Sequence, residues 1–377
     1  MANKKSFLDH KKIKSELKKY EIEDIDTIIE KIERQIKSII NSYKDKNKIA
    51  HKQYEEAIPI SLIYKSIDEL NLPKWVLSKI DDARVFGNSL QMIIFPDGEK
   101  YQINNSLNDL SGGDWLNFTN SVFSTFYSTN GKESYAHEIR KSHPSPKPPQ
   151  LMSEIIEFFT KENEIVFDFF MGVGGSLLGA SLCNRRAIGI DLNAKYIGLY
   201  KKAAEKIGLE IFPAKCGDCL EILNDKKEMH ALLHDEKIGL VLIDPPYANM
   251  MSKEKTGADI NIYGNKATPF TDEINDFGNL SINDFYNSLK KSIELVLPYL
   301  KKHGYIVIFI KDLQPTKKET NLLHANIIQT LNTIENINYK GLKIWADRSA
   351  KLFPYGYPFS FVANQIHQYI LIFRKEK

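Results

Sequence analysis

The sequence predicts an α/β fold with a mostly parallel sheet of seven strands, closed by an antiparallel strand, and a smaller, mostly helical N-terminal region. Two observations support this prediction. The apolar run at 238–243 stops at Asp244-Pro245-Pro246, as expected of a strand buried on both faces, because two prolines continue neither a helix nor a strand ladder. The stretch at 163–182 is typical of a strand, a tight glycine turn and a helix. In such sheets, ligands bind at the carboxyl ends of the strands.

The first 132 residues are expected to form a separate region. Seven apolar residues repeat there at alternating spacings of three and four, which is the heptad pattern of a helix with one apolar seam: Ile22, Ile25, Ile29, Ile32, Ile36, Ile39 and Tyr43. The seam fits either a helix packed on its own domain or a coiled coil that joins two copies of the chain. Lysines between Lys4 and Lys19 offer contacts to phosphate, but such runs are commonly solvated faces.

A β-hairpin is predicted after Trp75. Two short alternating stretches, 91–95 and 101–103, flank Pro96-Asp97-Gly98, which favours a turn. The next segment, 111–127, begins with glycines and is rich in aromatic residues, which either stack on nucleobases or pack in the core.

The turn after the strand at 163–168 contains Gly172, Gly174 and Gly175. Glycine permits positive φ and close approach of a ligand, and the helix start offers free N–H groups. The turn lacks a Gly-Lys-Ser/Thr ending and the glycine spacing of a dinucleotide fingerprint. Neither a phosphate-binding loop for ATP or GTP nor a dinucleotide site is therefore expected.

Acidic residues end four successive predicted strands: Asp168, Asp191, Asp218 and Asp244. Asp191 is a candidate to accept hydrogen bonds from the two hydroxyls of a ribose, and Asp218 is a candidate to bind an adenine amino group. One such acid is commonly a solvated loop residue, whereas four along one sheet edge favour a binding site. A helix at 282–300, a strand at 304–310 and an antiparallel pair at 341–345 and 369–374 complete the predicted fold.

The tetrapeptide Asp244-Pro245-Pro246-Tyr247 suits chemistry on an aromatic amine, although a strand-ending turn is the simpler interpretation of it alone. An aromatic amine is a poor nucleophile because its lone pair is delocalised into the ring. The Asp244 carboxylate and the Pro245 carbonyl, directed at the amino hydrogens, would favour a pyramidal nitrogen with a free lone pair. The ring of Tyr247 would stack on the heterocycle.

Composition sets further limits. The 377 residues allow one catalytic domain and one smaller unit, and a net charge of +3 means that any nucleic-acid-binding face is a local patch. No apolar stretch approaches membrane length and the N-terminus has no signal-peptide core, so a cytoplasmic protein is expected. Cys216 and Cys219 have the spacing of a zinc half-site, but no second pair accompanies them, and no metal is expected.

Together these motifs resemble the S-adenosylmethionine-dependent DNA amino-methyltransferases, over roughly residues 133 to 375. The resemblance implies a Rossmann-like class I methyltransferase fold, with S-adenosylmethionine as the cofactor. The segment from His143 to Gln150 resembles the part of the family that contacts the methionine of the cofactor. The catalytic residues that it implies are Asp244, Pro245, Pro246 and Tyr247. The implied cofactor-binding residues are His143, Lys147, Pro148, Asp168, Phe170, Gly172, Gly174, Gly175, Asp191, Leu192, Asp218 and Cys219.

The chain departs from the family pattern in places. Phe169 stands where the family often has proline, and the order of segments differs from the permuted group with the most similar His-Pro-x-x-Lys-Pro segment. With a catalytic domain at 133–377, DNA recognition is expected either in residues 1–132 or in 248–280, a long polar connection predicted to be a mobile DNA-contacting loop. The aromatic loop at 354–361 is expected to form a wall of the pocket for a flipped base, with Tyr355 or Phe359 as candidates.

The resemblance implies site-specific methylation of a flipped base in double-stranded DNA, with adenine N6 favoured over cytosine N4. A cognate restriction endonuclease and a second copy of the chain are further candidate partners, and no membrane partner is expected. Methylation of RNA bases or of a glutamine amide, and a non-catalytic DNA-binding module, are the alternatives. Methylation of a cytosine ring carbon is excluded, because no cysteine stands beside a proline in the catalytic region.

Overall fold

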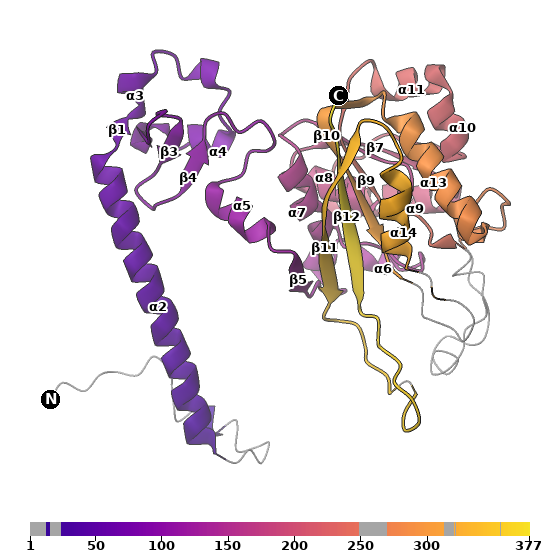
Figure 1. Ribbon diagram of the computed structural model, residues 1–377, viewed down its shortest axis with the longest axis horizontal. Coiled ribbons are helices and arrows are strands. Elements are labelled where there is room, and N and C mark those ends of the chain that lie inside the picture. Colours follow the sequence, from indigo (N-terminus) through magenta and orange to yellow (C-terminus); the bar gives the residue numbers. More distant parts are fainter. Residues whose placement is uncertain (1–12, 16–23, 249–269, 313–319, 321, 355) are drawn as a thin grey trace. The chain divides into compact units, whose positions relative to one another are not determined.

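The computed structural model describes residues 13–15, 24–248, 270–312, 320, 322–354 and 356–377 (Figure 1). The chain divides into two compact units, residues 1–105 with 111–113, and residues 106–110 with 114–377. The expected boundary lay between residues 132 and 133. It differs because β5 (Val122–Thr125) pairs in parallel with β11 (Ile337–Asp347), which assigns residues 114–132 to the second unit.

The first unit combines a long helix with a small antiparallel sheet of order β1-β2-β3-β4. Its helices are α2 (Ile25–Glu56), α3 (Ile60–Ile63) and α4 (Lys74–Leu77), with 3-10 turns at Asp68–Leu70 and Ile80–Asp82. Its strands are β1 (Ile58–Pro59), β2 (Arg84–Phe86), β3 (Met92–Ile94) and β4 (Lys100–Gln102). The predicted hairpin is confirmed as β3 and β4, whose turn contains Gly98 at φ 83°. Buried Val76, Val85 and Ile93 form the core of this unit.

The apolar seam of α2 is only partly covered by the described residues. Ile29 is buried, whereas Ile32 and Ile39 are 39% and 56% exposed. The C-terminal end of the helix is anchored in its own unit, since the Tyr54 hydroxyl donates a hydrogen bond to the Asp82 carbonyl over 2.9 Å. Ile22 and the side chain of Tyr43 lie outside the described residues.

The second unit is built on a sheet of eight strands in the order β5-β11-β12-β10-β9-β6-β7-β8. Besides β5 and β11, its strands are β6 (Ile165–Asp168), β7 (Arg186–Asp191), β8 (Ala214–Cys216), β9 (Ile238–Ile243), β10 (Leu300–Ile310) and β12 (His367–Lys375). Among the described strands of this sheet, β12 alone runs in the opposite direction, antiparallel to both β11 and β10. The predicted α/β class with one antiparallel strand is confirmed. The sheet has eight strands rather than seven, because β5 extends it beyond β11.

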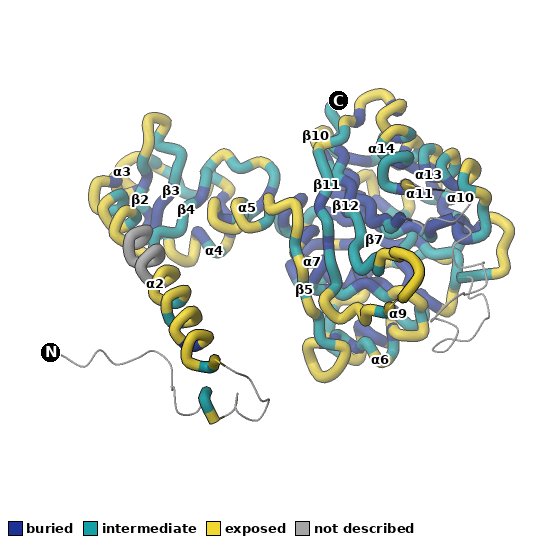
Figure 2. Tube along the Cα trace, turned by 60° about the horizontal axis from the view of Figure 1, so that its bottom comes forward, coloured by how far each residue is buried: buried dark blue, intermediate teal, exposed yellow. Residues whose placement is uncertain are grey.

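Helices cover both faces of this sheet (Figures 1 and 2). One face packs against α7 (Pro149–Phe159), α8 (Gly175–Leu182) and α9 (Ala194–Ile207); the other packs against α10 (Cys219–Asn224), α11 (Lys226–Leu233), α13 (Ile282–Val296) and α14 (Leu323–Leu331). Leu240 and Leu242 of β9 face the first layer, and Val241 and Ile243 face the second. All six residues of β9 are buried, which confirms the prediction of a strand covered on both faces.

Two shorter helices, α5 (Gly112–Phe118) and α6 (His137–Arg140), and the 3-10 turns Lys132–Ser134 and Phe277–Asn279 lie in the connections between these elements. The edge strand β5 is held in place by Lys343 of β11, whose ammonium group donates to the carbonyls of Phe118 and Asn120. Burial lowers the pKa of Lys343 to about 8. None of the helices in the described part of the chain is long and apolar enough to span a membrane.

Candidate active site

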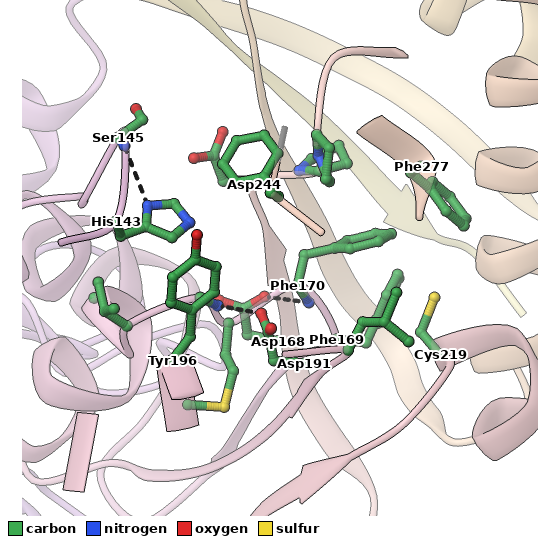
Figure 3. Close-up of a pocket in the computed structure, with 18 of the residues that line it drawn as sticks. His143, Ser145, Asp168, Phe169, Phe170, Asp191, Tyr196, Cys219, Asp244 and Phe277 are labelled. Atoms are coloured by element: carbon green, nitrogen blue, oxygen red, sulfur yellow. Dashed lines mark hydrogen bonds between the residues drawn. The ribbon is translucent and has the colours of Figure 1, made fainter. Parts of the chain in front are cut away.

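A cavity of about 240 Å³ opens at the carboxyl ends of the central strands β6, β7 and β9, entirely within the second unit (Figure 3). These strands are parallel, so their ends meet at one edge of the sheet. Fourteen of the sixteen predicted site residues line this cavity: His143, Lys147, Asp168, Phe170, Gly172, Gly175, Asp191, Leu192, Asp218, Cys219, Asp244, Pro245, Pro246 and Tyr247.

Gly174 and Pro148 lie elsewhere. Gly174 precedes α8 at φ 73°, and a Cβ atom there would lie 2.2 Å from Cδ2 of Tyr200, so close packing requires glycine at this position. Pro148 precedes α7 and lines a second cavity of about 270 Å³, which shares Lys147 with the first.

Asp168, at the end of β6, fixes the glycine-rich turn. Its Oδ1 accepts a hydrogen bond from the Phe170 N–H over 2.9 Å, and its Oδ2 accepts one from the Ser176 hydroxyl. Burial raises the pKa of Asp168 to about 7. The side chain therefore ties the turn to the start of α8.

Asp191, at the end of β7, also has both oxygens engaged. Oδ2 accepts from the Gly172 N–H over 2.7 Å and Oδ1 from the Asn193 N–H over 2.8 Å. Burial raises the pKa of Asp191 to about 6. Each carboxylate oxygen carries a second lone pair, so Asp191 can also accept hydrogen bonds from two hydroxyls of a ligand.

Asp218 caps the start of α10 through its Oδ1, which accepts from the Leu220 N–H over 2.8 Å. Its Oδ2 accepts from the Asn275 side-chain amide over 2.7 Å. Cys219, the next residue, is 6% exposed, belongs to the hydrophobic core and lines the cavity with its side chain. The side of the cavity near Asp218 therefore combines a carboxylate oxygen with apolar walls.

The C-terminal end of the predicted DNA-contacting loop, from residue 270 onward, lines this same cavity. Residues 249–269 of that loop lie outside the described residues, but Phe270, Thr271, Asn275, Asp276 and Phe277 line the cavity. The Phe277 ring packs against Phe170 at 4.9 Å between centroids. Sequence patterns do not identify these residues, because their segment has no strand or helix periodicity.

His143 lies across the cavity from Phe277, between two aromatic rings (Figure 3). Its imidazole lies 4.7 Å from the Tyr196 ring and 5.2 Å from the Phe270 ring, centroid to centroid. Burial lowers the pKa of His143 to about 4, and Nδ1 accepts a hydrogen bond from the Ser145 N–H (Figure 3). A Cβ atom on Gly172 would lie 3.1 Å from Nε2 of this neutral imidazole.

Lys147, a predicted cofactor-binding residue, lines the cavity and pairs with the predicted catalytic acid. Its Nζ lies 2.5 Å from Oδ2 of Asp244, and the Tyr247 hydroxyl donates to Oδ1 over 2.8 Å. Lys147 and Tyr247 are only 6% and 8% exposed. The Asp244 carboxylate is thus held from two sides by buried donors.

The backbone of Lys147 is fixed in turn by a residue without any sequence signal. The guanidinium of Arg140, which is fully buried, donates to the carbonyls of Lys147 and Tyr135 over 2.9 and 3.0 Å. Burial lowers the pKa of Arg140 to about 10. On the other side, a Cβ atom on Gly175 would lie 2.9 Å from the Lys147 carbonyl oxygen.

Of the two candidates for a wall of the flipped-base pocket, one is wrong and the other lies outside the described residues. Phe359 is 92% exposed and lines neither of the two cavities, so it is not a wall of a pocket, and Tyr355 lies outside the described residues. Within the described ranges, no group of three or more His, Cys, Asp or Glu side chains is placed to hold a metal ion.

A mostly parallel sheet with one antiparallel strand and a cavity lined by acids at its carboxyl edge is the architecture of a Rossmann-like α/β enzyme. The profile of the DNA methylase family, which acts at N6 or N4 amines, matches residues 3–202 and 238–377, and the chain belongs to this family. Its members use S-adenosylmethionine as the cofactor.

Curated relatives match shorter stretches. The chain is 41% identical over 73 residues to the type II methyltransferase M.HindIII of Haemophilus influenzae, covering 19% of this chain and 23% of the relative. It is 33% identical over 93 residues to M.HpaI of Haemophilus parainfluenzae (24% and 30%), and 28% identical over 146 residues to M.HinfI of Haemophilus influenzae (36% and 41%). These matches thus span less than half of each relative. Among solved structures, TrmN from Thermus thermophilus aligns with a TM-score of 0.36 at 14% identity, over 63% of this chain and 51% of that chain.

Proposed function

We propose that this chain transfers the methyl group of S-adenosylmethionine to the exocyclic amine of a base in double-stranded DNA, with adenine N6 as the target. One observation carries the proposal. Asp244 follows the central strand β9 at the edge of the cavity, its carboxylate is held by Lys147 and Tyr247, and Pro245 lines the cavity beside it.

The residues of the cavity suit this cofactor. Asp191 offers acceptor lone pairs for the ribose hydroxyls, and Asp218 offers an acceptor for the adenine amine. Phe170 and Phe277 supply apolar surface for the adenine ring. Gly172, at φ 50°, keeps the turn open, because any side chain there would meet His143. When bound, S-adenosylmethionine supplies an electrophilic methyl group on a sulfonium.

Asp244 acts on the amine of the target base. Its carboxylate accepts a hydrogen bond from one amino hydrogen while the Pro245 carbonyl accepts the other, which frees the nitrogen lone pair for attack. The methylated nitrogen must then lose one proton, and Asp244 is the base positioned to take it. Lys147 and Tyr247 hold the carboxylate in its orientation through their hydrogen bonds, and both are positioning residues.

In this proposal Lys147 positions the catalytic carboxylate rather than binding the cofactor. Its ammonium group is bonded to the catalytic carboxylate, and the backbone clamp from Arg140 sets its position. Because each carboxylate oxygen has two lone pairs, Asp244 can keep both donors and still accept a hydrogen bond from the substrate.

The setting of the reaction is part of the proposal. The relatives named above are type II methyltransferases, which supports a restriction-modification system with a cognate endonuclease. The exposed isoleucines of α2 support a second copy of the chain as a partner through a coiled coil.

The test is methyl transfer from labelled S-adenosylmethionine to mixed-sequence duplex DNA, followed by digestion to nucleosides and identification of the labelled one by mass. We expect the label in N6-methyl-2′-deoxyadenosine. Label in N4-methylcytosine would mean that cytosine is the target base, with the same transfer to an exocyclic amine. Label in RNA or protein alone, or no label despite cofactor binding, would contradict the proposal.

A further inference from the structure

The segment between β11 and β12 projects from the sheet at the edge that carries the active site. β11 runs antiparallel to β12, β12 antiparallel to β10, and β10 parallel to β9, so β11 and β9 end at the same edge. Residues 348–366 leave this edge and return to it, beyond the ends of both strands (Figure 1). We call these residues, apart from 355, the arm.

The base of the arm borders the active site directly. Asp347 and Ser349 line the second cavity together with Lys147. Gln368, at the start of β12, lines both cavities, and its side-chain Oε1 is buried without a hydrogen-bond partner among the described residues. Anything bound against the base of the arm therefore lies next to the cavities that Lys147 and Gln368 line.

The arm presents large apolar side chains to solvent. Phe359 and Phe361 are 92% and 93% exposed, Tyr357 is 80% exposed and Leu352 is 69% exposed. Scattered apolar residues are common on protein surfaces, but such a group on one projecting segment indicates a contact surface. The arm therefore offers aromatic area to a partner.

The backbone of the arm is ordered by its own hydrogen bonds rather than by burial of these side chains. The Asn364 side chain accepts from the Phe353 N–H and donates to the Phe353 carbonyl, each over 2.8 Å. The N–H groups of Phe359 and Ser360 both donate to the Gly356 carbonyl over 2.7 Å. The aromatic rings are thus presented at little further conformational cost.

The charge of the arm selects among partners. From 348 to 366 the sequence contains Arg348 and Lys351 but no aspartate or glutamate, and both cations are exposed. A segment that carries both exposed cations and exposed aromatic rings suits a partner with phosphates and stacked bases. A base taken out of a duplex leaves a gap in the stack that an aromatic side chain can fill.

We propose that the arm is a DNA-binding surface, on which Phe359 and Phe361 stack against bases of the duplex around the target while Arg348 and Lys351 contact the flanking phosphates. This inference rests on the proposed function, because it takes the occupant to be the substrate of the adjacent site. It assigns to the arm a DNA-contacting role that the sequence analysis expected of residues 248–280.

The test compares the full-length protein with F359A/F361A and R348S/K351S in duplex DNA binding by fluorescence anisotropy, over a range of salt concentrations. I211A is the matched control, since Ile211 is 41% exposed and precedes β8 at the opposite edge. We expect F359A/F361A to weaken DNA binding by about 10-fold or more at every salt concentration. We expect R348S/K351S to reduce the slope of log K against log salt by roughly 1 to 2. Cofactor affinity and melting temperature should not change.

Other outcomes are distinguishable. If F359A/F361A binds DNA as the wild type does while the wild type methylates DNA, the inference is wrong and the proposed function stands. If the wild type binds duplex DNA through the arm but transfers no methyl group, the proposed function is wrong and the inference stands. If F359A/F361A binds DNA as the wild type does but is a monomer where the wild type is a dimer in sedimentation velocity, the arm contacts a second copy and the inference is wrong.

Discussion

The cavity and the arm lie at the same edge of the same sheet, but their side chains differ in environment. Those of the cavity are bonded within the protein, and those of the arm are exposed to solvent. In the cavity, Asp168, Asp191 and Asp244 each have both carboxylate oxygens engaged by protein donors. In the arm, Phe359 and Phe361 contact almost nothing of the protein. The cavity is preorganised for a small, fixed ligand, and the arm is suited to a large, external one.

The difference separates stability from function. A substitution in the cavity changes buried charges or close packing, so it should affect folding as well as chemistry. A substitution in the arm removes exposed surface, so it should weaken binding of the partner without changing stability. Substitutions in the cavity therefore test the first side of this comparison, and substitutions in the arm test the second.

Apart from removal of Asp244 itself, the largest effect is expected from K147M. Loss of the ammonium group removes one of the two donors to Asp244, and we expect the single-turnover rate to fall about 100-fold at saturating cofactor and DNA. K147R should recover part of the rate, and K141M, at an exposed lysine of the same segment, should behave as the wild type.

A double-mutant cycle provides a readout that needs no activity. K147M leaves a carboxylate without its buried partner and should lower the free energy of unfolding by about 3 kcal/mol, whereas K147M/D244N should recover most of that loss. A weaker cofactor affinity with an unchanged rate would instead make Lys147 a cofactor ligand.

The next effect concerns packing beneath the glycine turn. G174A places a Cβ atom 2.2 Å from Tyr200 at φ 73°, and we expect it to lower the free energy of unfolding by about 2–4 kcal/mol. Gly198 of α9 is the control, because a Cβ atom there would meet nothing within 4 Å, and G198A should be neutral or slightly stabilising. Urea denaturation measures both; equal effects would show that the turn tolerates a side chain.

The smallest effect is a pH dependence of stability. The pKa of Asp168 is raised by burial from 3.8 to about 7 in the folded chain, so the folded state binds more protons than the unfolded state between these values. The free energy of unfolding should therefore fall as the pH rises from about 4 to 7. D168N should flatten this slope and D81N, at an exposed acid, should not. A slope that D168N leaves unchanged would assign the effect to other groups.

Much of the catalytic unit could be predicted from the sequence, because its signals are local. The buried strand β9, the glycine turn and the acids at the strand ends are each encoded within a few consecutive residues. Fourteen of the predicted site residues consequently meet at one cavity. Their functional roles remain predictions that the experiments above test.

Contacts between distant segments could not be predicted in this way. Lys147 and Asp244 are 97 positions apart, and nothing in the motif around Lys147 specifies the direction of its side chain. The pairing of β5 with β11 depends on Lys343, more than 200 positions from the carbonyls that it bonds. The exposure of Phe359 likewise follows from the path of the chain rather than from its composition, which fits a core residue equally well.

The most direct test of the central claim is single-turnover methyl transfer by D244A, with the affinities for S-adenosylmethionine and duplex DNA measured on the same preparation. If Asp244 acts on the amine of the target base, the rate should fall by about 1,000-fold or more while both affinities stay within about threefold of the wild type. Transfer at a near wild-type rate would contradict the account, as would a loss of transfer explained entirely by weaker cofactor binding.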